Sequence, residues 1–88
     1  MGRYAVSFKP SAERTLRRLP KGVQRRIVSA VDSLADDPRP SGVVKLRGDT
    51  NLWRIRVGDY RAVYEIHGDR LVVLILRVAH RKDVYRRT

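Results

Sequence analysis

Arginines at strand-like spacing stand out in the second half of the chain as side chains that could bind phosphate. Arg54 and Arg56 lie two residues apart, and Arg61 follows five residues later. Each guanidinium is planar, stays charged at neutral pH and can hydrogen-bond a phosphate through two parallel N–H donors. Because arginine does not release its proton near pH 7, we expect these residues to bind phosphate and stabilise charge, not to act as general bases.

A second group of residues that could take part in catalysis lies near the C-terminal end of the sequence: His80, Arg81 and Tyr85. If residues 81–86 form a short helix, Arg81 and Tyr85 share one face and His80 lies at the junction with the preceding strand. Histidine, with an ordinary pKa of about 6.5, suits either proton-transfer role. A tyrosine base would need its pKa of about 10 lowered, which neighbouring arginines favour. A lone histidine or terminal tyrosine is more often structural, but their occurrence together beside a basic sheet favours a catalytic role.

The elements that must position these side chains are three predicted strands, over residues 52–57, 60–66 and 70–78. Each run is rich in β-branched and aromatic residues, and the runs are separated by Gly58-Asp59 and by His67-Gly68-Asp69, which are turn sequences. A two-residue turn at Gly58-Asp59 places on the core face Trp53, Ile55, Val57, Tyr60, Ala62 and Tyr64. The opposite face then carries Arg54, with Arg56 directly across from Arg61, a like-charged pair that an anion would relieve. The alternative is a solvated face whose arginines are held apart by their flexible stems.

Arg77 interrupts the otherwise apolar third run, and its face depends on the second turn. A three-residue loop at 67–69 puts Leu71, Val73, Ile75 and Arg77 on the face of Arg61, whereas a loop of two or four residues turns Arg77 toward the core. Its charge favours the three-residue loop. Arg77 could then contact phosphate or pair with Glu65 or Asp83, and Glu65 is also a weak candidate for a general base.

The sequence of the N-terminal half predicts one strand followed by two helices. Apolar alternation over residues 4–8 indicates a strand, and helical periodicity indicates helices over 10–19 and from Pro20 to before Asp36, followed by a loop at 38–42. We therefore expect an α+β fold, in which an N-terminal strand and an α-helical hairpin pack on one face of a small antiparallel sheet, with a short C-terminal helix. Residues 1–88 are expected to form a single domain.

The charge composition of the chain indicates what kind of partner it binds. The chain has 20 Lys and Arg against 9 Asp and Glu, giving a net charge of +11, which indicates nucleic acid or another polyanion as a partner. It has no cysteine, and its acidic residues are scattered, so we expect no metal site and no cofactor. No segment is long and apolar enough to span a bilayer, so we expect no membrane association and a cytoplasmic location.

Two segments of the chain resemble a known family. Residues 52–65, with the motif GDYR, and residues 76–86, with HRKDVY, resemble the RelE/ParE toxin superfamily in its RelE branch. The order and lengths of the N-terminal elements match as well, but carry little motif information.

The resemblance implies a metal-free endoribonuclease toxin that cleaves mRNA, typically in the ribosomal A site, by attack of the ribose 2′-hydroxyl on the phosphodiester. It implies an acidic RelB-like antitoxin, contacts with mRNA and 16S rRNA, and a monomeric toxin within the toxin–antitoxin complex. The catalytic residues it indicates are Arg61, His80, Arg81 and Tyr85. The RNA-binding residues we assign are Lys45, Arg47, Arg54, Arg56, Arg77 and Lys82.

Two departures and two alternatives accompany this assignment. Arg54 and Arg56 stand where the family has lysines, which removes them as general bases, and Ala79 replaces a glycine that is common before HR. The first alternative is a ParE-like inhibitor of DNA gyrase, which would share the fold. The second is a non-catalytic basic module that binds nucleic acid through phosphate contacts.

Overall fold

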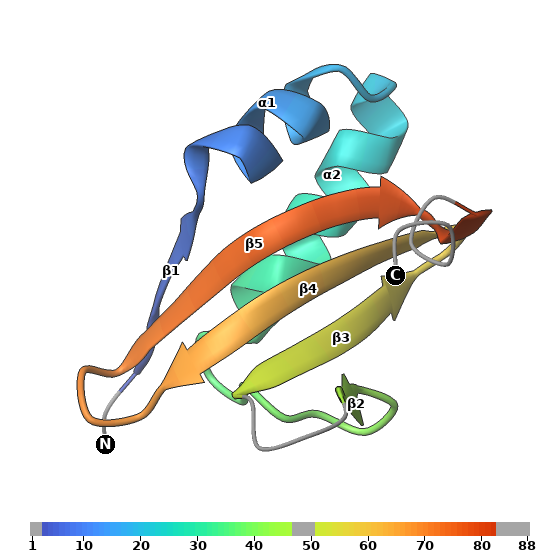
Figure 1. The fold of residues 1–88 in the computed structure, drawn as a ribbon. Helices are drawn as coiled ribbons and strands as arrows, with labels where there is room; N and C mark the ends of the chain where they lie inside the picture. The colour runs from blue at the N-terminus through green and yellow to red at the C-terminus, as the bar shows by residue number, and fades with distance from the viewer. Residues whose placement is uncertain (1–2, 47–50, 83–88) are drawn as a thin grey trace.

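Five strands and two helices form an α+β fold in the computed structural model, which describes residues 3–46 and 51–82 (Figure 1). The elements follow the chain in this order: β1 (Ala5–Phe8), α1 (Pro10–Arg17), α2 (Lys21–Ser33), β2 (Val44–Lys45), β3 (Leu52–Val57), β4 (Tyr60–His67) and β5 (Val72–His80). The sheet order is β1-β5-β4-β3-β2. The predicted α+β class is confirmed, and the edge strand β2 was not predicted.

The two helices are delimited by prolines, as expected. Pro10 begins α1, where its fixed φ suits the first helical turn and its missing N–H costs no hydrogen bond. Pro20 is the N-cap of α2. The Gln24 side chain donates a 2.7 Å hydrogen bond to the Leu19 carbonyl, which fastens α2 to the turn that leaves α1. Neither helix in the described part of the chain is long and apolar enough to cross a membrane.

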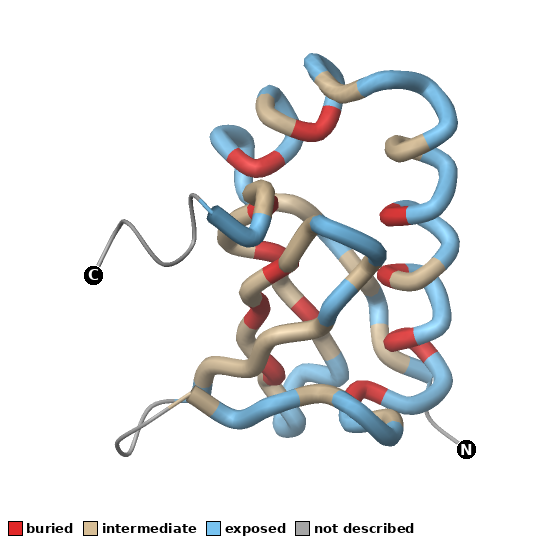
Figure 2. The backbone as a smooth tube through the Cα atoms, turned by 90° about the vertical axis from the view of Figure 1, so that its right-hand side faces the viewer, coloured by how far each residue is buried: buried red, intermediate tan, exposed pale blue. Residues whose placement is uncertain are grey.

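Both helices lie on one face of the sheet and bury their apolar sides against it (Figure 2). The helical core side chains recur at helical spacing and belong to Ala12, Leu16, Ile27, Val31 and Leu34, and those of the sheet belong to Ala62, Tyr64, Ile66, Val73, Ile75 and Val78. The helices therefore cover one face only, and we call the opposite face of β3, β4 and β5 the outer face.

The β3–β4 hairpin has the predicted register. Val57 pairs with Tyr60 and Arg56 with Arg61 across a two-residue turn. Gly58, the first turn residue, has a φ of +61°, and this position requires glycine in the type II′ turn that matches the twist of paired strands. The turn geometry and the alternation of side chains together fix which residues face outward.

The β4–β5 hairpin differs from the three-residue loop predicted at residues 67–69. His67 pairs with Val72, so the loop has four residues, and Val73 and Ile75 are buried in the core instead of facing outward. A register shift next to Val63 and Tyr64 then inserts one extra residue in β5. This β-bulge reverses the alternation, as bulges do. Arg77 consequently pairs with Val63 on the outer face, the face expected for it but reached by a different path.

The N-terminal strand corrects one feature of the predicted sheet. β1 pairs with β5 in parallel, from Ala5 opposite Val72 to Phe8 opposite Ile75. The sheet is therefore mixed and not wholly antiparallel. The helical hairpin carries the chain across the sheet so that β3 runs in the direction of β1, and the antiparallel hairpins β3–β4 and β4–β5 then leave β5 in that same direction.

Candidate nucleic-acid interface

Arginines from three neighbouring strands occupy one end of the outer face. The paired positions Arg56 and Arg61 form one row across β3 and β4. The next row begins with Arg54, passes through Val63 on β4 and ends with Arg77 on β5. Four guanidinium-bearing residues thus stand on two adjacent rows of a sheet whose strands lie about 4.8 Å apart.

The burial of these arginines differs. Arg54, Arg61 and Arg77 are partly buried, whereas Arg56 is exposed. The stems of partly buried arginines pack on the apolar part of the sheet while their charged ends reach solvent. A cation that is partly removed from water interacts more strongly with a phosphate than a fully solvated one does, because solvent screens it less.

Backbone oxygens at the turn hold two of the guanidinium groups. Arg56 Nε donates to the Gly58 carbonyl at 3.2 Å, and Arg61 Nη1 lies 3.4 Å from the Tyr60 carbonyl. A guanidinium has five N–H donors, so a bond to one backbone oxygen is compatible with two further bonds to a phosphate. The turn therefore orients Arg56 and Arg61 toward the same end of the sheet.

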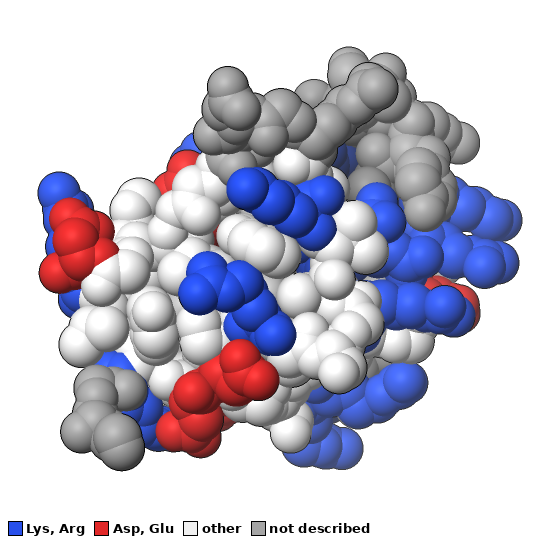
Figure 3. All heavy atoms as spheres, turned by 90° about the horizontal axis from the view of Figure 1, so that it is seen from below, with Lys and Arg blue, Asp and Glu red and all other residues white. Residues whose placement is uncertain are grey.

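The segment after β5 returns to this same turn. The backbone N–H of Arg81 donates to the Asp59 carbonyl at 2.7 Å, which places Arg81 beside the β3–β4 turn. Lys82 is held next to it, because its N–H donates to Nδ1 of His80 at 3.3 Å. Arg81 and Lys82 are both exposed. Seen from below, Lys and Arg side chains gather toward the right-hand side of the molecule, the side of this turn in Figure 1 (Figure 3).

His80 lies at the end of β5 but on the side of the helices. It pairs with Tyr60, and the two rings meet edge to face with their centroids 5.3 Å apart. Tyr60 packs against the hydrophobic core, so His80 does not share the outer face with Arg61. Ala79 is the β5 residue opposite Arg61. His80 is at the predicted junction at the end of β5, around the end of the sheet from Arg56 and Arg61.

The remaining predicted residues separate into two groups. Arg47 and Tyr85 lie outside the described residues, as do residues 83–86 of the predicted C-terminal helix. Lys45 pairs with Trp53 on the side of the sheet that faces the core, and its Nζ lies 5.9 Å from the centre of the Trp53 ring. The structure therefore places Lys45 away from the outer-face arginines.

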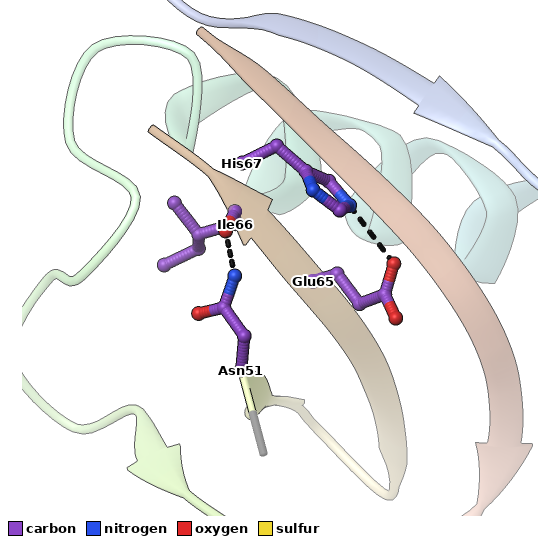
Figure 4. Close-up of polar contacts among 4 residues, drawn as sticks. All are labelled: Asn51, Glu65, Ile66 and His67. Atoms are coloured by element: carbon purple, nitrogen blue, oxygen red, sulfur yellow. Dashed lines mark hydrogen bonds and ion pairs between the residues drawn. The ribbon is translucent and has the colours of Figure 1, made fainter. Parts of the chain in front are cut away.

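A carboxylate–histidine pair lies farther along β4 on the outer face. His67 Nε2 and Glu65 Oε1 are 2.9 Å apart, and Figure 4 shows the two side chains turned toward each other. In the same view the side chain of Asn51, which precedes β3, donates to the Ile66 carbonyl of β4. This bond links the two neighbouring strands at the end far from the β3–β4 turn. Six residues at about 3.3 Å each separate His67 from Arg61, roughly 20 Å. His67 is therefore too distant to exchange protons at a phosphate that Arg61 holds.

The described residues contain no group of three or more His, Asp or Glu side chains arranged to hold a metal ion. The side chains around the β3–β4 turn belong to Arg56, Arg61, Arg81 and Asp59, with His80 and Tyr60 nearby.

Comparison with known proteins identifies the family of this chain. Residues 6–85 match the family described as the ParE toxin of type II toxin–antitoxin systems, parDE. The chain belongs to the RelE/ParE toxin superfamily. Toxin RelG of Mycobacterium tuberculosis is 36% identical over 85 residues, covering 96% of this chain and 98% of the relative. Toxin RelE3 of Methanocaldococcus jannaschii is 30% identical, with 91% and 93% of the two chains covered.

Solved structures place this superfamily member among RelE-type folds. The archaeal RelE–RelB complex of Pyrococcus horikoshii contains a chain that superposes with a TM-score of 0.80 at 34% identity, covering 89% of this chain and 94% of that one. The RelBE2 toxin–antitoxin complex of Mycobacterium tuberculosis gives a TM-score of 0.79 at 31% identity, with 89% and 98% covered.

Proposed function

We propose that this member of the RelE/ParE superfamily is a metal-free endoribonuclease toxin that cleaves mRNA, in the ribosomal A site. The observation that carries the proposal is the direct pairing of Arg56 with Arg61 on the outer face, beside the row that holds Arg54 and Arg77. Opposed like charges destabilise a sheet unless an anion lies between them. A phosphodiester fits that position in charge and in hydrogen-bonding capacity.

The reaction proposed is attack of a ribose 2′-hydroxyl on the adjacent phosphorus, with formation of the new P–O bond and departure of the 5′-oxygen. The products are a 2′,3′-cyclic phosphate and a free 5′-hydroxyl. Negative charge grows on the phosphoryl oxygens in the transition state, and Arg61 and Arg81 are assigned to stabilise it. Arg54, Arg56, Arg77 and Lys82 are assigned to hold the flanking phosphates.

The proton transfers require a base for the 2′-hydroxyl and an acid for the leaving 5′-oxygen. The arginines cannot exchange protons at neutral pH, so these roles are assigned to His80 and Tyr85. His80 follows Ala79, the residue opposite Arg61, and directly precedes Arg81. Its imidazole lies at the same end of the sheet as Arg61 and Arg81, on the side of the helices.

The partners proposed follow from charge and from the relatives. A net charge of +11 favours association with an acidic antitoxin, and the RelE-type structures described above were solved as complexes with RelB. The same charge favours mRNA and 16S rRNA as partners, within the cytoplasm.

The first prediction tests cleavage directly. Brief expression of the protein in bacterial cells should slow growth and create new mRNA 5′ ends within coding regions, because the transcripts are cut during translation. Arg61→Ala, Arg81→Ala and Tyr85→Phe should each lower the abundance of these ends by at least about 100-fold, the usual scale for the loss of a transition-state donor. The measurement is sequencing of mRNA 5′ ends.

Arg14→Ala is the matched control, since it removes one exposed arginine from α1, on the covered side of the sheet. This variant should cleave like the wild type. Cleavage that persists unchanged in Arg61→Ala, or that falls equally in Arg14→Ala, would contradict the assignment of the outer face.

The match to the parDE toxin family favours one second candidate, inhibition of DNA gyrase. In that case the wild type slows growth while transcripts stay intact and covalent gyrase–DNA adducts accumulate. Expression followed by parallel assays of mRNA ends and of gyrase adducts separates the two functions. Binding of RNA without either outcome would indicate a non-catalytic nucleic-acid-binding module.

A further inference from the structure

A further arginine, Arg26, reaches the β3–β4 turn from the helical layer of the fold. α2 runs past the end of β3, and Arg26 lies on the side of this helix flanked by Val23 and Ala30. Its guanidinium occupies the space above Gly58 where any other residue would carry a side chain. A Cβ built on Gly58 would lie 2.7 Å from Nη2 and 3.4 Å from Cζ of Arg26.

This contact concentrates positive charge around one turn. Arg56 donates to the Gly58 carbonyl, and the N–H of Arg81 donates to the Asp59 carbonyl. Arg26 adds a further charge on the helix side, so that Arg56 and Arg26 flank the turn from opposite faces of the sheet. Arg26 is exposed and therefore accessible to a ligand. Repulsion among these cations favours binding of an anion that spans the turn.

We infer that Arg26 is a further RNA-binding residue, which holds a phosphate next to the linkage bound at Arg56 and Arg61. The inference rests on the proposed function. An RNA strand that leaves the outer face at the end of β3 passes over the turn and meets the Arg26 guanidinium on the helix side. Gly58 thus has two roles: it permits the turn, and its missing side chain gives the guanidinium room to approach.

The neighbouring Arg25 provides a control of equal charge. Arg25 lines a shallow hollow on the other side of α2, together with Gln24, Val28, Ser29 and Asp32. Arg25 and Arg26 are both exposed, and both belong to the same turn of the helix. Replacement of either residue by glutamine changes the net charge equally but alters only one side of α2.

The test measures binding of a single-stranded 2′-O-methyl oligoribonucleotide, which cannot be cleaved by 2′-hydroxyl attack. Arg26→Gln should weaken binding about three- to tenfold and reduce the slope of log K against log salt by about 1, as the loss of one phosphate contact requires. Arg25→Gln should retain the wild-type slope. In cells, Arg26→Gln should lower the yield of new mRNA 5′ ends, while Arg25→Gln leaves the yield unchanged.

A second variant acts on the same contact without changing charge. Gly58→Asn places a Cβ where the Arg26 guanidinium lies, and it also strains the turn, because this position has a φ of +61°. The strain is the same with or without Arg26, so only the part of the effect that depends on Arg26 reports the contact. Gly58→Asn should weaken RNA binding in the wild-type background and have little further effect in Arg26→Gln, so that the two changes are non-additive. Thermal unfolding of each variant establishes that the domain is folded.

The outcomes separate this inference from the proposed function. If the wild type cleaves mRNA but Arg26→Gln and Arg25→Gln have the same salt slope and cleavage yield, the assignment of Arg26 is wrong and the nuclease remains. If the wild type does not cleave mRNA at all, the proposed function and this inference fail together.

Discussion

At the scale of single residues, the outer face and the core use polar side chains in opposite ways. Arg56 and Arg61 lie opposite each other although their charges repel, which costs stability and leaves a position for an anion. Tyr64 is fully buried and uses its hydroxyl to hold the Pro38 carbonyl at 2.7 Å, which fastens the loop after α2 to the sheet. The first arrangement suits the proposed binding of phosphate, and the second stabilises the core.

Tyr64→Phe tests the value of that buried hydroxyl. The variant should lower the free energy of unfolding by about 1 to 3 kcal/mol, because the Pro38 carbonyl loses its partner while the ring still fills the core. Urea unfolding at pH 7 measures the change. Tyr60→Phe is the control, since its ring is only partly buried at the edge of the core, and it should be less destabilising.

The same residue predicts a loss of stability at alkaline pH. Burial raises the pKa of Tyr64 from 10.0 to about 12, with nearby Arg39 lowering it and Asp37 raising it to smaller extents. The native state keeps a proton that the unfolded state releases, so the contribution of Tyr64 is complete below pH 10 and is lost between pH 10 and 12. In Tyr64→Phe the decline in unfolding free energy over this interval should be shallower. Parallel declines in the two proteins would contradict this assignment.

At the scale of elements, the β4–β5 hairpin decides which side chains reach the outer face. Its four-residue loop ends at Leu71, which has a φ of +54° and is 39% exposed. The left-handed conformation costs an L-residue roughly 1 to 2 kcal/mol. The Leu71 carbonyl accepts a 2.8 Å hydrogen bond from the N–H of Ala5, where β1 joins the sheet.

Leu71→Gly should therefore stabilise the protein by about 0.5 kcal/mol, since relief of the left-handed strain exceeds the entropy that glycine adds to the unfolded state. Leu71→Ala is the matched control, because it removes the exposed side chain but keeps the Cβ and hence the strain. The free energy of unfolding in urea distinguishes the two variants. A larger gain in Leu71→Ala than in Leu71→Gly would show that exposure of leucine, and not its backbone conformation, is the cost.

At the scale of the whole molecule, the net charge of +11 opposes the compact state and favours polyanions. Raising NaCl from about 0.05 M to about 0.5 M should raise the melting temperature, because screening weakens repulsion among exposed cations. The same change should weaken RNA binding, because the release of counterions from the RNA gains less entropy when the salt concentration is already high. Calorimetry and binding titrations over one salt series measure both, and a melting temperature that falls with salt would contradict the charge argument.

The sequence by itself determined the features that depend on local patterns. Helical periodicity and two prolines defined α1 and α2. Glycine in a two-residue turn fixed the β3–β4 register, and with it the pairing of Arg56 with Arg61. These features follow from the periodicity of apolar side chains and from the residue preferences of tight turns, both of which depend only on residues close together in the sequence.

Tertiary structure alone decided the parallel pairing of β1 with β5, the bulge in β5 and the approach of Arg26 to Gly58. The residues of β5 are almost uniformly apolar, so alternation could not reveal the extra residue that returns Arg77 to the outer face. The placement of His80 with Tyr60 and of Arg26 at the turn depends on how the helix layer docks on the sheet. That docking is set by packing between residues distant in the chain, which no local pattern encodes.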